Sequence, residues 1–238
     1  MISKHGFYAY AVVGNHQLKK DNVFPVNYKD LTLIGKVVNI SDFQKELQEA
    51  LKNPKAMEEV LTGHQGILNR LMRKTTVIPF QFGTILKDRE AAAGYLKSSY
   101  AKYKGLLKKF KDRQEWGVRV FADLKKSRNT QKSGSGTAYL LRKKQEEEAE
   151  KTTNEKLTSF SGEILNSLRE LAFEYKVTES AQRFSEKGEL HISVFAFLLD
   201  KPKVRQFSQK LKSLQKKYQK FGLSLTASGP WPAYNFVS

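Results

Sequence analysis

The chain has no cysteine among its 238 residues. This excludes disulfides and thiolate chemistry, and it removes the commonest ligands of structural zinc. Long apolar runs are missing as well, since the longest, at 192–199, is far shorter than the roughly 20 residues that span a bilayer. We therefore expect no membrane segment and no export signal, and the chain is predicted to stay in the cytoplasm.

Motifs for catalysis are also lacking. The four histidines stand apart from one another, with no pair at helical spacing and no cysteine partners. No phosphate-binding loop, dinucleotide-binding glycine pattern or nucleophile elbow occurs in the sequence. The sequence thus predicts a protein that is not an enzyme, with no catalytic, cofactor-binding or metal-binding residues.

Positive charge is abundant, because 42 Lys and Arg face 24 Asp and Glu and give a formal net charge of +18. Basic residues cluster at 97–113 and 201–220. Each cluster is either the solvated face of an amphipathic helix or a surface for an acidic partner. The candidate partner-binding residues of the two clusters are Lys102, Lys108, Lys109, Lys210 and Lys217, and a predicted helix at 54–72 adds Arg70 and Arg73.

A basic nucleic-acid-binding protein is the alternative function, since so many cations could contact phosphates. Lysine greatly outnumbers arginine, however, and the sequence holds neither a Cys-bearing zinc finger nor an aromatic signature of RNA-binding sheets. Nucleic acid is therefore expected to be the less favoured partner.

Hydrophobic periodicity predicts an α+β fold with two domains, each an antiparallel or mixed sheet with packed helices. In the first domain, residues 1–113, we expect strands at 6–14 and 31–40, helices at 41–52 and 54–72, β structure at 75–86 and a long helix at 88–110. Ser41 is the expected N-cap of the first helix.

The second domain, residues 114–238, is predicted to be ferredoxin-like. Its expected elements are a strand at 115–124, a basic loop at 125–136, a long charged helix at 137–175, a strand at 189–200, an amphipathic helix at 204–221 and a strand at 222–231. The aromatic segment 228–238 closes the chain.

The closing segment, SGPWPAYNFVS, carries three aromatic residues where chains usually end in polar, disordered residues. Two interpretations remain open for Trp231, Tyr234 and Phe236. They fold back and seal the core of the second domain, or they form a docking surface for a partner, since Trp and Tyr are common interface anchors.

Two stretches of the sequence follow recognisable patterns. The first, at 77–84, fits V-[IL]-P-x-x-F-G-T and includes Phe82, and the second, at 228–236, fits [ST]-G-P-W-P-x-Y-x-F. Both patterns resemble motifs of the gas vesicle protein F/L family. The stretches FYAYAVVG, GHQGILNRLM, EWGVRVFADL and GTAYLLRKK add to the likeness, which extends in order over nearly the whole chain.

This resemblance implies an accessory protein of gas vesicle assembly that has two α+β domains and no enzymatic activity. Its implied partner is the small hydrophobic shell protein, with other gas vesicle accessory proteins as further candidates, and its implied location is the gas vesicle. Such a protein is expected to support nucleation or growth of the shell. The candidate partner-binding residues from the two motifs are Phe82, Trp231, Tyr234 and Phe236.

Overall fold

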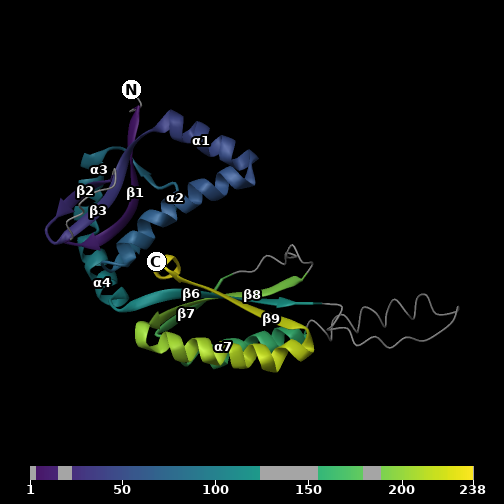
Figure 1. Cartoon of the computed structure of the whole chain (residues 1–238). Helices are drawn as coiled ribbons and strands as arrows, with labels where there is room; N and C mark the ends of the chain where they lie inside the picture. The colour runs from purple at the N-terminus through teal and green to yellow at the C-terminus, as the bar shows by residue number, and fades with distance from the viewer. Residues whose placement is uncertain (1–3, 16–22, 124–154, 179–188, 238) are drawn as a thin grey trace. The chain divides into compact units, whose positions relative to one another are not determined.

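The computed structural model describes residues 4–15, 23–123, 155–178 and 189–237. Contacts divide the chain into two compact units (Figure 1): unit 1 is Met1–Gln114 with Trp231–Ser238, and unit 2 is Glu115–Pro230. The first boundary lies one residue from the expected one. The closing residues differ from expectation, since by their contacts they belong to unit 1 and not to the second domain.

Unit 1 is built on a five-stranded antiparallel sheet. Its strands are β1 (His5–Gly14), β2 (Phe24–Tyr28), β3 (Leu31–Asn39), β4 (Val77–Pro79) and β5 (Ile85–Leu86). They are ordered β2-β3-β1-β4, and β5 also pairs with β1. Residues 6–13 of the central strand β1 are all buried. Burial on both faces explains why this stretch is a continuous apolar run and does not alternate with polar residues.

Helices lie on both sides of this sheet, with α1 and α2 on one side and α3 and α4 on the other (Figure 1). Their bounds are α1 Ile40–Lys52, α2 Pro54–Met72, α3 Arg89–Ser98 and α4 Tyr100–Phe110. The single helix expected at 88–110 is thus two helices that meet at Ser99.

Asparagines start the first two helices. Asn39 caps α1, because its Oδ1 accepts the N–H of Ser41 at 3.0 Å, so the expected cap at Ser41 is wrong. Asn53 caps α2 in the same way, and Pro54 then takes the first helical position, where its missing N–H costs nothing. This cap fixes the start of the helix that carries much of the candidate site.

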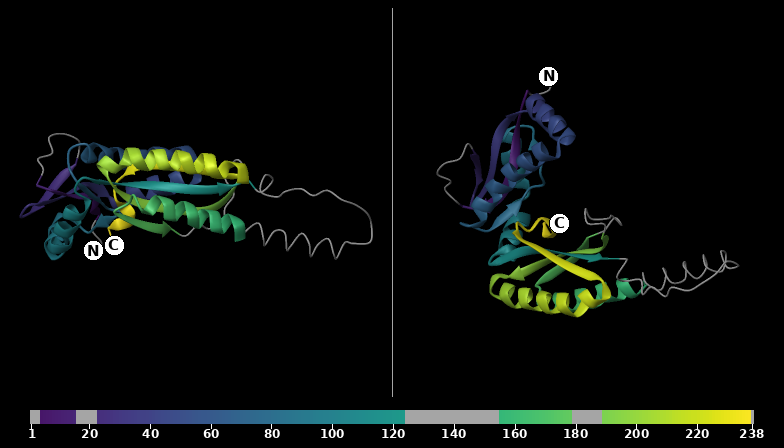
Figure 2. Two further views of the ribbon diagram at one scale, coloured as in Figure 1. Left: turned by 90° about the horizontal axis from the view of Figure 1, so that it is seen from below. Right: turned by 45° about the vertical axis from the view of Figure 1, so that its right-hand side comes forward.

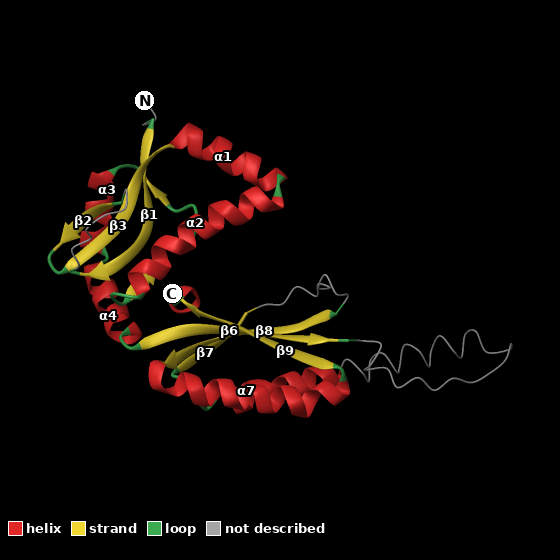
Figure 3. Ribbon diagram, in the orientation of Figure 1, coloured by secondary structure: helices red, strands yellow, loops and turns green. Residues whose placement is uncertain are grey.

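Unit 2 contains a four-stranded sheet in the order β7-β8-β6-β9. Its elements are β6 (Arg113–Ala122), a helix at 155–169, β7 (Glu174–Thr178), β8 (Leu190–Asp200), α7 (Val204–Tyr218) and β9 (Leu223–Trp231). Among the described residues of unit 2 the order along the chain is strand, helix, strand, strand, helix, strand. Both helices cover the same face of the sheet (Figure 3), with a core between them and the strands.

The long charged helix expected at 137–175 falls partly outside the described residues, as does the basic loop at 125–136. Its expected C-terminal end is wrong, because the helix stops at residue 169 and β7 begins at Glu174. Tyr175 and Val177 pair with Phe197 and Phe195 of β8. Alternate apolar residues here follow the period of a strand, and pairing with β8 stabilises that conformation.

Candidate functional site

The closing segment is anchored in unit 1 by two of its aromatic residues. Phe236 is completely buried, and its carbonyl oxygen accepts a hydrogen bond from Lys109 Nζ at 3.4 Å. The same ammonium group lies 5.8 Å from the centre of the Phe236 ring, within the range of a cation–π contact. The segment therefore seals a core, as one interpretation of the sequence held, but the core is that of unit 1.

Tyr234 joins a chain of hydrogen bonds that runs through the interior of unit 1. His64 of α2 contacts Tyr8 Oη through Nδ1 at 2.7 Å and Tyr234 Oη through Nε2 at 3.2 Å. Tyr8 Oη also accepts the N–H of Gly83 at 3.2 Å. The directions of the two His64 hydrogen bonds depend on its tautomer: with the hydrogen on Nε2, Tyr8 Oη donates to Nδ1 and Nε2 donates to Tyr234 Oη.

Burial favours the uncharged forms of Tyr8 and His64. It raises the pKa of Tyr8 to about 12, although the hydrogen bond from Gly83 acts in the opposite direction. Burial also lowers the pKa of His64, and the positive charge of Lys36 adds to that effect. The imidazole of His64, held between the hydroxyls of Tyr8 and Tyr234, fixes the position of the closing segment.

Around this chain the surface of unit 1 is hollowed into a pocket of about 670 Å³. It is lined by Pro54, Met57, Glu58, Leu61, Thr62, His64 and Gln65 of α2, by Gln81 and Phe82, and by Trp231 and Tyr234 of the closing segment. Among these lining residues Glu58 is the one with a carboxylate. Leu61 and Trp231 stand at the rim with 43% and 37% of their surface exposed, although both are large and apolar.

The structure brings three of the candidate residues together in this pocket, namely Phe82, Trp231 and Tyr234. Phe82 also packs edge-on against the rings of Tyr8 and His64, with centroids 6.3 and 5.5 Å apart. The motif stretches at 77–84 and 228–236 are therefore neighbours in space, although Phe82 and Trp231 are 149 positions apart along the chain.

The basic candidate residues do not form one surface within unit 1. Arg70 and Arg73 are exposed at the end of α2, Lys102 and Lys108 are exposed on α4, and Lys109 is partly buried against Phe236. None of the five lines the pocket.

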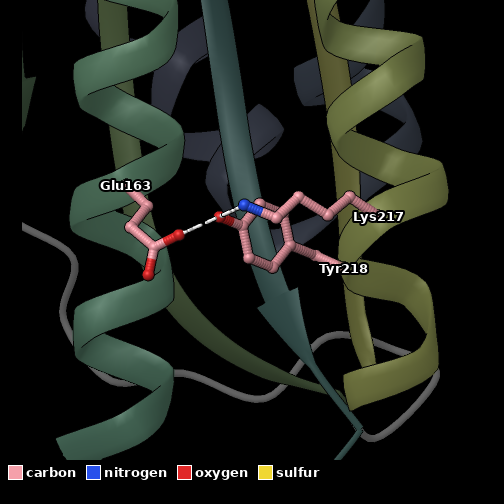
Figure 4. A network of polar contacts seen from close by, with 3 residues as sticks. All are labelled: Glu163, Lys217 and Tyr218. Atoms are coloured by element: carbon pink, nitrogen blue, oxygen red, sulfur yellow. Dashed lines mark hydrogen bonds and ion pairs between the residues drawn. The ribbon is translucent and has the colours of Figure 1, made fainter.

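Lys210 and Lys217 belong to α7 of unit 2, and both are exposed. Lys217 takes part in a local network (Figure 4), in which its Nζ lies 3.3 Å from Glu163 Oε2 and 2.9 Å from Tyr218 Oη. Tyr218 Oη donates to the same carboxylate. The hydrogen bond from Tyr218 lowers the pKa of Glu163 most, and the hydrogen bond from Lys217 lowers it further. The network links the helix at 155–169 to α7, so Lys217 has a structural partner.

Sequence reasoning missed His64, Tyr8, Met57 and Leu61. A signal for three of them was present, because Met57, Leu61 and His64 follow one another at steps of four and three and so share one face of a helix. No pattern in the sequence shows that this face meets the closing segment.

Within the described ranges, no three or more His, Asp or Glu side chains gather in a way that could hold a metal ion. Nor does any helix of those ranges combine the length and apolar character that crossing a bilayer requires.

The pocket and the fold can be compared with known proteins. The family model described as gas vesicle synthesis protein GvpL/GvpF matches residues 6–238. Gas vesicle protein F1 of Halobacterium salinarum is 22% identical over 242 residues, which cover 97% of this chain and 92% of that protein. Gas vesicle protein L of a Streptomyces species is 20% identical over 221 residues, which cover 89% of this chain and 82% of that protein.

Two solved structures share the fold. The gas vesicle protein GvpF of an Anabaena species superposes with a TM-score of 0.72 at 19% identity and covers 98% of this chain and 96% of its own. The GvpF of Microcystis aeruginosa gives a TM-score of 0.69 at 14% identity, and the match covers 98% of this chain and 99% of that one. The α+β architecture with two antiparallel sheets is therefore common to these proteins.

Proposed function

Because the chain belongs to the GvpL/GvpF family of gas vesicle synthesis proteins, and so acts in gas vesicle assembly, we propose that it binds the small hydrophobic shell protein and supports nucleation or growth of the shell. It does this as a non-enzymatic accessory protein, in the cytoplasm where vesicles form. Other accessory proteins of the vesicle are its further partners.

The observation that carries this proposal is the pocket of unit 1. A protein that covers a hydrophobic shell subunit before it is incorporated needs an exposed apolar surface, since such a subunit would otherwise aggregate. Leu61 and Trp231 supply that surface at the rim, and Met57 and Phe82 extend it into the pocket.

Rigidity strengthens the case for the pocket as a binding surface. Trp231 is held three residues from Tyr234, which is bound by His64, and five residues from the buried Phe236. An anchor that is already fixed loses little conformational entropy when a partner binds, so more of the contact energy appears as affinity. In this proposal Phe236 seals the core of unit 1, and Trp231 belongs to the surface that binds the shell protein.

Co-expression with the shell protein tests the proposal. The wild-type chain should retain the shell protein through a wash at high salt, which weakens charge attraction but leaves apolar contacts intact. Leu61→Ser should reduce the retained amount several-fold. Leu51→Ser is the matched control, because Leu51 is an equally large side chain of unit 1 that is 71% exposed and lies outside the pocket.

Trp231→Ala should reduce retention in the same way, with circular dichroism used to check that the variant is folded. Equal retention by wild type, Leu61→Ser and folded Trp231→Ala would place the shell-binding surface elsewhere on the chain. Failure of the wild type to retain the shell protein would contradict the proposed function itself.

A further inference from the structure

The outer face of α7 in unit 2 carries a row of positive charge with no acid beside it on the same segment. Residues 201–221 hold eight Lys and Arg and neither Asp nor Glu, although the whole chain has 24 acidic residues. The inner face of α7 is apolar, with Phe207, Leu214 and Tyr218 buried against the sheet. The charge is thus confined to the exposed side.

Three cations of α7 lie on the side away from that core. Successive residues of an α-helix turn by about 100°, which places Arg205, Lys212 and Lys216 roughly opposite the buried face. Together with Lys220, which lies in the 3-10 turn Gln219–Phe221 that follows α7, we call them the outer stripe. All four are exposed. In the described part of the chain no member of the outer stripe forms an ion pair, whereas Lys203 and Lys217 at its flanks pair with Asp200 and Glu163.

The surroundings of the outer stripe leave room for a ligand of opposite charge. The helix at 155–169 lies beside α7 on the same face of the sheet (Figure 2). Its exposed residues include the uncharged Ser159 and Asn166, and also charged residues of both signs, namely Glu155, Lys156, Glu163 and Arg169. The carboxylate of Glu163, which could otherwise neutralise the outer stripe, is already bound by Lys217 and Tyr218.

We propose that the outer stripe binds an acidic helical segment of a partner protein, at a site separate from the shell-binding pocket. Lys212 and Lys216 are four residues apart on α7, a rise of about 6 Å along the helix, and Lys220 follows four residues later in the 3-10 turn. A partner helix with carboxylates at every fourth residue has the same repeat, so each cation meets one carboxylate when the helices lie alongside each other.

Nucleic acid fits the outer stripe less well than a protein carboxylate row. Three of its four cations are lysines, whereas arginine is the residue that binds phosphate in a bidentate manner. The outer stripe itself contains no aromatic ring on which a base could stack. Nucleic acid therefore serves as a comparison ligand in the test.

Fluorescence anisotropy with a labelled synthetic peptide tests the proposal. The probe is a helical peptide of about 20 residues with glutamate at every fourth position, and its partner probe has the same composition in scrambled order. A single-stranded DNA of equal charge is the third probe. Binding to the full-length chain is measured at about 0.15 M salt, which screens diffuse attraction to the net charge.

Two variants that remove the same amount of charge separate the outer stripe from general basicity. The first replaces its members by glutamine, as R205Q, K212Q, K216Q and K220Q together. The control replaces four exposed lysines of unit 1 that lie outside both basic clusters, as K45Q, K52Q, K74Q and K87Q together. All eight positions are exposed, so both variants are expected to fold, which thermal melting confirms.

We expect the ordered peptide to bind the wild type, and the outer-stripe variant to bind it roughly tenfold more weakly, because four exposed ion pairs are lost. The control variant should stay within about twofold of the wild type. Equal losses in both variants, equal binding of the scrambled peptide, tighter binding of the DNA, or no binding of the ordered peptide would each overturn the proposal. Failure of this test leaves the shell-binding test unaffected, since none of the eight residues lines the pocket.

Discussion

Replacing Phe236 by alanine should destabilise unit 1, although the residue lies at the end of the chain and follows unit 2 directly in sequence. The side chain is completely buried, and its loss leaves a cavity beneath the closing segment. Truncation of a buried Phe to Ala typically costs about 3–5 kcal/mol. The loss also removes the ring that the Lys109 ammonium faces at 5.8 Å, so we expect the upper part of this range.

Hydrogen exchange followed by mass spectrometry locates the effect. A loss of about 3–5 kcal/mol speeds the exchange of amides that open only on unfolding by about two to three and a half orders of magnitude. This acceleration should appear in peptides from β1 and α2, and peptides from β8 should change little. Phe24→Ala is the matched control, because Phe24 belongs to unit 1 but is 46% exposed.

The opposite pattern would refute the reasoning. If β8 amides accelerate while those of β1 keep their protection, the closing segment stabilises unit 2, as the sequence alone had indicated. Equal effects of Phe236→Ala and Phe24→Ala would show that Phe236 is not sealing a core.

Three further changes test the interior of unit 1. Gly35→Ala should unfold unit 1 or lower its free energy of unfolding by at least about 1–3 kcal/mol, because a Cβ there would lie 2.2 Å from Cε1 of Phe7 and 2.5 Å from the Tyr8 carbonyl oxygen. A thermal melt measures the effect, and an unchanged melting temperature would contradict the packing. Tyr8→Phe should cost about 1–3 kcal/mol in urea unfolding, since the Gly83 N–H and His64 both lose a buried partner; a cost near zero would contradict the hydrogen-bond chain. Because the pKa of His64 is lowered in the folded state, the unfolded chain takes up a proton at this histidine at a higher pH than the folded chain does. The free energy of unfolding should therefore fall as the pH drops below about 6.5. The His64→Gln variant should lose less stability between pH 7.5 and 5.5 than the wild type.

Much of the fold could be predicted because its signals are local. The helix at 54–72 coincides with α2, since an Asn cap, a proline at the first position and apolar residues at steps of three and four all lie within the segment. The strands β1, β3 and β8 were predicted close to their observed bounds for the same reason. Their apolar runs are long enough to be distinguished from loops.

Other elements were missed because tertiary contacts decide them. β2 is short and contains Pro25, which argues against a strand, but it lies at the edge of the sheet and pairs only with β3. The start of β7 was taken for the end of a helix, because the helical pattern that ends near Leu171 was extended to residue 175, although Tyr175 and Val177 alternate with the period of a strand and pair with β8. A strand depends on a distant partner in a way that a helix does not.

In the candidate site, too, some features follow from local sequence signals and others from tertiary contacts. The sequence alone identified Phe82, Trp231 and Tyr234 as unusual, since their motifs carry prolines and aromatics in fixed order. It also determined the basic outer face of α7, because the charges and the apolar stripe lie on one helix and follow its period. Only the tertiary structure decided that the closing segment packs on unit 1, that His64 binds it, and that Leu61 and Trp231 border one pocket. Those contacts join residues about 170 positions apart, and no local periodicity records them, because they form only when the whole of unit 1 has folded around them.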